Sequence, residues 1–138
     1  MVSDWSISDL PGLTSIERIA LLELGITTTR QLLITAPDLA TKQQLAISLG
    51  VRIQGVNKLI ALAELSQLPG IGCTYNGLLL HTGIISIKQL AQMPAHQIHQ
   101  QLLRLHVATL QRRDLCPDLA QIQGWIKQAQ RLINHKIS

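Results

Sequence analysis

The stretch Leu68-Pro69-Gly70-Ile71-Gly72 decides how the rest of the sequence is interpreted, because a similar stretch occurs earlier in the chain. The earlier stretch is Leu10-Pro11-Gly12-Leu13, 58 positions before it, and the similarity continues without a gap as far as Leu32 and its counterpart Leu90. Self-similarity at a fixed spacing is typical of a repeated supersecondary unit. We therefore predict that the chain consists of two copies of one unit.

The end of the repeat indicates where the two copies differ. Ile53-Gln54-Gly55-Val56 returns as Ile122-Gln123-Gly124-Trp125, now 69 positions later. Because the spacing has grown from 58 to 69 positions, the second copy carries extra residues, which we place near 108–119. The predicted modules are residues 1–66 and 67–138, and the very short junction between them favours direct contact.

Each copy has the signals of short helices joined by tight turns. The Pro-Gly pairs mark turns. Gly25 and Gly83 suit the left-handed residue that follows a helix end. Thr28 and Ser86 can cap the next helix with a hydroxyl group. We therefore expect a helix to end and another to begin at the same place in each copy.

Apolar residues recur at helical spacing in both copies. They are Ile16, Ile19, Ala20 and Leu24 in the first copy, and Leu119, Ile122, Ile126, Ala129 and Ile133 in the last helix of the second. Pro37 and Pro94 mark the start of a third helix in each copy. The alternation typical of strands is missing. We predict an all-α fold with eight to ten short helices.

Composition limits the class of protein. Of the 138 residues, 46% are hydrophobic and 14% are charged, which suits a packed core and excludes a disordered chain. No apolar run approaches the roughly 20 residues that span a bilayer, and the first residues lack the pattern of a secretory signal. Two cysteines do not make a disulfide framework. We therefore expect a protein of the reducing cytoplasm, without a membrane span.

Charge is divided unevenly between the two copies. Residues 1–66 hold five basic and six acidic residues, a net charge of −1. Residues 67–138 hold seven basic and two acidic residues, a net charge of +5, together with all five histidines. This asymmetry favours a polyanionic or acidic partner for the C-terminal half, although an ordinary solvated basic face explains it equally well.

The second turn and its flanking helices resemble the helix-hairpin-helix motif. Residues 68–72 would join two helices, and Gly83-Ile84 would lead into a further, capped helix. In that family, the backbone amides of a Gly-hydrophobic-Gly turn approach a nucleic-acid phosphate. Glycines allow an anion to come close, and a following helix start directs its amides and positive dipole end outward. Such contacts recognise phosphate and not base sequence.

The longer pattern, ending in residues 123–129, also resembles a bacterial family of tandem helix-hairpin-helix proteins known only as a domain of unknown function. This resemblance implies two duplicated helix-hairpin-helix-like modules of short helices packed together. The first copy departs from the motif, because Leu13-Thr14 replaces the second glycine, and Asp9 and Glu17 add negative charge. The second copy continues with Cys73-Thr74-Tyr75, where DNA-binding members often carry lysine or arginine. A purely structural hairpin is therefore the alternative interpretation of the turn.

No other motif supports catalysis, a metal or a cofactor. His96 and His99, three positions apart in a predicted helix, are more typical of surface histidines than of a metal site. Cys73 lies at a predicted helix start, where a thiolate is stabilised, but a small buried cysteine is the simpler interpretation. Asp114 and Asp118 are the only acidic residues of the second copy, and no phosphate loop, dinucleotide fingerprint or nucleophile elbow is present. We expect a non-catalytic protein.

Two functions from different classes follow from these observations. The first is sequence-independent contact between the second module and the backbone of duplex nucleic acid. The residues expected to carry it are Gly70, Ile71, Gly72 and Thr74 in the turn, and Arg104, Arg112, Arg113, Lys127 and Arg131 around it.

The scarcity of aromatic rings disfavours single-stranded nucleic acid as the ligand. Trp5, Tyr75 and Trp125 are the whole supply for base stacking, and Trp125 lies beside an apolar stripe and is expected in the core. The alternative function is a protein-interaction adaptor, in which the hairpins are structural. In that case the apolar run Leu78-Leu79-Leu80 is available to a partner chain or to the sister module.

Overall fold

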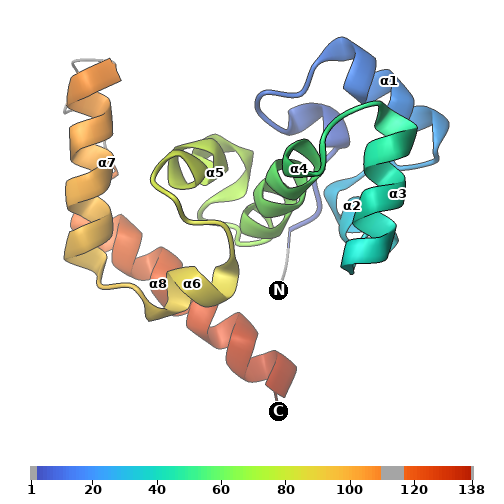
Figure 1. Cartoon of the computed structure of the whole chain (residues 1–138). Coiled ribbons are helices and arrows are strands. Elements are labelled where there is room, and N and C mark those ends of the chain that lie inside the picture. The colour runs from blue at the N-terminus through green and yellow to red at the C-terminus, as the bar shows by residue number, and fades with distance from the viewer. Residues whose placement is uncertain (1–2, 110–116, 138) are drawn as a thin grey trace.

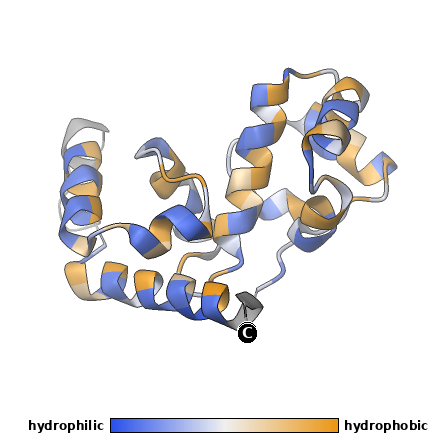
Figure 2. Ribbon diagram, turned by 60° about the horizontal axis from the view of Figure 1, so that its bottom comes forward, coloured by the Kyte–Doolittle hydropathy of each residue, from blue (hydrophilic) through white to orange (hydrophobic). Residues whose placement is uncertain are grey.

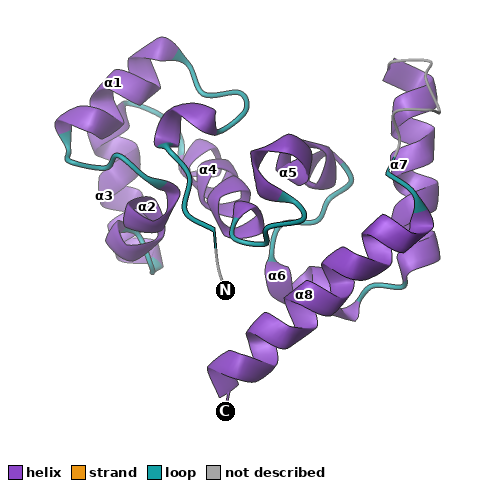
Figure 3. Cartoon of the chain, turned by 180° about the vertical axis from the view of Figure 1, so that it is seen from behind, coloured by secondary structure: helices purple, strands orange, loops and turns teal. Residues whose placement is uncertain are grey.

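The regular structure of the chain is helical. The computed structural model describes residues 3–109 and 117–137, with side chains described for 3–105 and 117–134. The elements in chain order are η1 (Ile7–Asp9), α1 (Ser15–Glu23), α2 (Thr29–Thr35), α3 (Leu39–Leu49), α4 (Ile53–Ser66), α5 (Gly72–His81), α6 (Ile87–Gln92), α7 (Ala95–Thr109) and α8 (Leu119–Ile137), as seen in Figures 1 and 3. In these residues the only β-type pairing is an isolated bridge between Ser6 and Thr28. The predicted all-α class is confirmed.

Polar side chains and glycines set several helix boundaries as predicted. Thr28 and Ser86 each accept a hydrogen bond from a backbone N–H in the first turn of the following helix, at 3.2 and 3.0 Å. Gly25 and Gly83 have φ angles of +82° and +93°, which are strained for residues with a Cβ atom. The same local geometry therefore occurs at both places in the sequence repeat, while the duplication itself stays a prediction.

The first of two hydrophobic clusters is formed by the helices up to α4. Helix α4 packs against α2 and α3, and α1 packs against α3. Leu21 of α1, Leu32 of α2, Leu49 of α3 and Leu59 of α4 are among the buried side chains of this cluster. Burial of such side chains supplies the main driving force for folding, roughly 1.5–3 kcal/mol for each fully buried one.

The second cluster lies among α5, α6, α7 and α8. Helix α8 packs against both α6 and α7, and it directs Ile122, Trp125 and Ala129 into this cluster. Figure 2 shows the orange apolar side of α8 and its blue polar side. Trp125 is buried, as expected, whereas the apolar stripe predicted for this helix does not extend to Leu119, which is exposed.

Helix α4 joins the two clusters, and contacts on both sides of it tie them together. Its Ala63 belongs to the first cluster and its Leu65 to the second. The indole N–H of Trp5, near the start of the chain, donates a hydrogen bond of 2.9 Å to the carbonyl oxygen of Ser66, the last residue of α4. The N-terminal segment is thereby fixed against the junction of the two predicted modules.

The apolar run Leu78-Leu79-Leu80, expected to be available to a partner chain or to the sister module, is covered within the chain. Leu79 is fully buried in the second cluster, and Leu78 is half-buried against the same cluster. Leu80 is half-buried as well, but it packs against the first cluster. The physical reason is the position of α5 beside α4, where apolar side chains on more than one face of the helix are covered within the chain.

Candidate functional site

The backbone amides of the second Pro-Gly turn are used within the protein. The N–H groups of Ile71 and Gly72 donate to the carbonyl oxygen of Leu68, at 3.0 and 2.9 Å. The N–H of Gly70 donates to the side-chain oxygen of Gln128 on α8, at 3.2 Å. The expectation that Gly70, Ile71 and Gly72 offer bare amides to a phosphate is therefore wrong for this structure, because a carbonyl and a side-chain amide already take that place.

Two tryptophans cover the glycines of this turn. A Cβ atom added to Gly72 would lie 2.6 Å from Cζ2 of Trp5, so only glycine fits beneath that ring. A Cβ atom added to Gly70 would lie 3.0 Å from Cδ1 of Trp125, whose indole N–H donates to the Gly70 carbonyl oxygen at 3.0 Å. Ile71 between them is 1% exposed. The turn is thus a packing element between two indole rings.

The start of helix α5, just after this turn, lies near a negative charge. Burial, and then the neighbouring Asp9 carboxylate, raise the pKa of the Cys73 thiol from 9.0 to about 11. A raised pKa keeps this thiol protonated at neutral pH and removes the reactive thiolate that the helix start would otherwise favour. Thr74, the other predicted site residue here, has an exposed side chain.

The described basic side chains that were predicted to contact nucleic acid lie on two helices of the C-terminal half. Arg104 is exposed on α7, and Lys127 and Arg131 are exposed one turn apart on α8. Gln128, which binds the Gly70 amide, follows Lys127 directly, so the α8 cations lie near the second turn. Arg112 and Arg113 lie outside the described residues.

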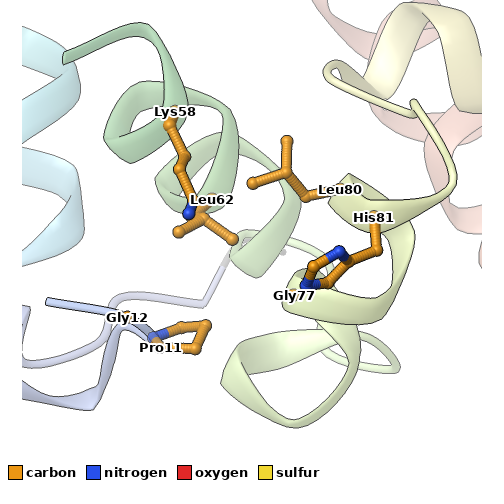
Figure 4. A pocket seen from close by; sticks show the side chains of 7 residues that line it. All are labelled: Pro11, Gly12, Lys58, Leu62, Gly77, Leu80 and His81. Atoms are coloured by element: carbon orange, nitrogen blue, oxygen red, sulfur yellow. The ribbon is translucent and has the colours of Figure 1, made fainter. Parts of the chain in front are cut away.

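The first Pro-Gly turn borders a cleft that was not predicted from the sequence. The cleft has a volume of about 310 Å³, and it is lined by Pro11, Gly12, Lys58, Leu62, Gly77, Leu80 and His81 (Figure 4). The only signal in the sequence was a glycine, Gly77, inside a helical pattern, where glycine costs about 1 kcal/mol relative to alanine. In the structure Gly77 faces Pro11, and an added Cβ atom would lie 3.3 Å from the Pro11 ring.

Exposed apolar side chains gather in the N-terminal half. Seven of the nine large hydrophobic residues that are exposed in the described chain belong to residues 16–47, so this half has the greater capacity for apolar contacts. They are Ile16, Ile19, Leu22, Leu24, Ile34, Leu39 and Ile47. The spacing of Ile16, Ile19 and Leu24 predicted a helix correctly, but the residue that α1 buries is Leu21.

The described residues contain neither a cluster of metal ligands nor a single helix that could span a membrane. Within them, no group of three or more histidine, cysteine, aspartate or glutamate side chains is placed to hold a metal ion. No single helix there is both long and apolar enough to cross a bilayer. Helices α3 and α4 reach that length and apolarity only as a pair, and the pair is bent by 111° at the break between them.

Comparison with known proteins places the chain in a family. Residues 11–132 match the model of the family described as "Domain of unknown function (DUF4332)". Because this match spans most of the 138 residues, the chain belongs to that family. Searches of curated proteins and of solved structures each give no significant match.

Proposed function

Since the description of the DUF4332 family names no activity, we propose from the geometry that this protein is a non-catalytic adaptor that binds a partner protein through helices α1–α3. The main support for this proposal is that seven of the nine exposed large hydrophobic residues of the described chain lie on or directly beside these helices. Ile16 on α1 is 79% exposed and Ile47 on α3 is 81% exposed, and the two helices pack against each other. Contiguous exposed apolar patches are typical of interaction sites, and the proposal is that these side chains form one.

The chemistry of this surface indicates what kind of partner it suits. Glu17 and Glu23 lie on α1 beside Ile16 and Ile19, and residues 1–66 carry a net charge of −1. A complementary partner presents apolar side chains together with lysine or arginine, because opposite charges at the rim guide association and like charges oppose it. An amphipathic basic helix has this character.

The closed second turn supports the adaptor over the phosphate-binding alternative. With Gly70 bound to Gln128 and Gly72 beneath Trp5, a phosphate would have to displace both neighbours before it reached an amide. These contacts stabilise the fold, because they hold α8 and the N-terminal segment against the turn.

The adaptor proposal is tested with an Ile16→Asp, Ile47→Asp double variant. Both side chains are exposed, so the changes should leave the fold intact, which circular dichroism checks. We expect that a partner captured by the wild-type protein from a native lysate, and then purified, binds the double variant at least tenfold more weakly, because two apolar contacts are worth more than 1.4 kcal/mol together.

Ile85→Asp is the matched control, because Ile85 is an exposed isoleucine of the C-terminal half. It should bind the same partner as the wild type does. The proposal is wrong if no purified protein binds the wild type directly, or if the α1–α3 double variant and the control bind equally well.

Nucleic-acid contact is the second candidate, favoured by the exposed cations Arg104, Lys127 and Arg131. Its test is the fluorescence anisotropy of labelled duplex DNA, titrated with the protein at several salt concentrations. The logarithm of the binding constant should fall linearly with the logarithm of the salt concentration, with a slope near −0.9 per phosphate contact. A Lys127→Gln, Arg131→Gln variant should reduce that slope by about two if these residues meet phosphates.

A Gln128→Ala variant separates the amide contribution from the charges, because it frees the Gly70 N–H without changing the net charge. Tighter DNA binding by this variant would favour a phosphate at the turn. Undetectable binding of the wild type at low salt would remove the nucleic-acid function altogether.

A further inference from the structure

The cleft beside the first Pro-Gly turn lies where the two halves of the chain meet. One wall comes from Pro11 and Gly12 near the N-terminus, a second from α4, and a third from α5 (Figure 4). Small-molecule sites occur preferentially in such positions between structural units, and their volumes begin at about 300 Å³. A cleft of about 310 Å³ is therefore large enough for a small ligand.

The lining combines an apolar floor with two basic groups at the rim. Pro11, Leu62 and Leu80 supply the apolar part, and Leu62 is almost fully buried. Lys58 on α4 and His81 on α5 are exposed, and Figure 4 shows their nitrogen-bearing ends on two walls of the same space. Among the described residues that line the cleft, none is acidic.

The walls of the cleft are fixed in position by packing and hydrogen bonding. Asn76, which is buried and directly precedes Gly77, donates from its side-chain nitrogen to the carbonyl oxygen of Leu62 at 3.1 Å. This bond joins α4 to α5 at the floor of the cleft. Gly77 then allows the Pro11 ring to approach α5, since even a methyl group there would be in tight contact with it. The site is thus largely preformed.

We propose that this cleft binds a small apolar monocarboxylate, such as a medium-chain fatty acid. The hydrocarbon body lies against Pro11, Leu62 and Leu80, and the carboxylate lies at the rim between Lys58 and His81. Most of the affinity comes from the apolar contact, because charges at an exposed rim contribute little. The Lys58 ammonium, together with an imidazole N–H of His81, selects a ligand with an anionic head group. This site rests on different residues from those of the adaptor surface.

The test uses octanoate as the probe, added to the ¹⁵N-labelled 138-residue chain and followed by the amide resonances. We expect saturable shifts at Gly12, Leu62, Gly77 and Leu80. Octylammonium, which has the same chain and the opposite charge, should bind at least threefold more weakly. A Lys58→Gln, His81→Gln variant should weaken octanoate about threefold to tenfold and lose the preference over octylammonium.

Lys88→Gln, His96→Gln is the matched control, because both residues are exposed and belong to α6 and α7, outside the cleft. It should bind octanoate as the wild type does. The proposal is overturned if the cleft amides do not shift, if the shifts fall on α1–α3 instead, or if octylammonium binds the wild type as well as octanoate does. It is also overturned if the control variant weakens binding as much as the cleft variant.

Discussion

Gly72 has a φ angle of +50° and lies beneath the indole ring of Trp5. Replacement by alanine therefore adds backbone strain and a clash, since the new Cβ atom would lie 2.6 Å from the ring. We expect Gly72→Ala to lower the free energy of unfolding by about 2–5 kcal/mol, combining about 1–2 kcal/mol of left-handed strain with about 1–3 kcal/mol of overpacking. Urea denaturation followed by circular dichroism measures this.

Gly83→Ala separates the two contributions to that cost. Gly83 has a φ angle of +93°, but nothing lies within 4 Å of its added Cβ atom, so only the strain should appear. In a Trp5→Ala background, the cost of Gly72→Ala should fall to that of Gly83→Ala, because the clash is gone. Equal costs for the two glycines in the wild-type background would show that Trp5 does not close the turn.

The Cys73 thiol should react slowly with thiol reagents. Its pKa is raised from 9.0 to about 11 by burial and then by Asp9, so at pH 8 the thiolate fraction is about 100-fold below that of an ordinary thiol. A more basic thiolate is also a better nucleophile, which reduces the expected deficit in rate to about tenfold.

The measurement is the rate of iodoacetamide reaction with a Cys116→Ala variant, in which Cys73 is the remaining cysteine. The rate should keep rising with pH up to about 11. In an Asp9→Asn background the rise should begin at lower pH, because one cause of the raised pKa is removed. A rate at pH 8 equal to that of a free cysteine peptide would contradict the burial of this thiol.

At the scale of elements, helix α3 carries a pH-dependent cap. Asp38 accepts hydrogen bonds at 2.9 Å from both the backbone N–H and the hydroxyl group of Thr41, and these bonds lower the pKa of the Asp38 carboxyl from 3.8. A lowered folded-state pKa means that the carboxylate contributes stability above about pH 4, and that this contribution is lost as pH falls through the folded value.

Asparagine caps a helix about as well as aspartate does but does not titrate. Asp38→Asn should therefore be slightly destabilising at pH 7 and less so at pH 3, below the ordinary carboxyl pKa of 3.8, where part of the charge contribution is lost. Urea unfolding of both proteins at the two pH values tests this. A difference between them that does not change with pH would mean that the Asp38 charge has no part in the cap.

Helix boundaries were predictable from the sequence where they are set by residues close by in the chain. The caps at Thr28 and Ser86 and the left-handed glycines at positions 25 and 83 depend on residues within one or two turns, so they were predicted correctly. What covers Leu78-Leu79-Leu80 was left open between a partner chain and the sister module, because it depends on which helix lies beside α5.

The prediction that the turn at residues 70–72 offers bare amides was wrong because the contacts that cover it are also non-local, and they span a longer range. Trp5 meets Gly72 across 67 positions of sequence, and Gln128 meets Gly70 across 58. A Gly-hydrophobic-Gly pattern specifies the backbone of a turn, but it does not specify what covers the turn. The cleft at Lys58 and His81 likewise depends on α4 and α5 lying together, which no local pattern encodes.

At the scale of the whole molecule, the contacts across α4 predict that the chain unfolds as one unit. Trp5 bonds to Ser66 and covers Gly72, Leu80 packs against the first cluster, and Asn76 bonds to Leu62. Opening either half would therefore break buried contacts of the other. Small domains with such shared contacts unfold in a single cooperative transition.

The two tryptophans report on different parts of the molecule, since Trp5 lies at the junction of the halves against Ser66 and Gly72, and Trp125 lies in the second cluster. In Trp125→Phe the fluorescence follows Trp5, and in Trp5→Phe it follows Trp125. Within each variant, we expect fluorescence and far-ultraviolet circular dichroism to give the same midpoint of urea unfolding. The two probes should also give the same dependence of the free energy of unfolding on urea concentration. If fluorescence and circular dichroism diverge in either variant, then the halves unfold separately, and α4 is a linker between independent modules instead of a shared wall.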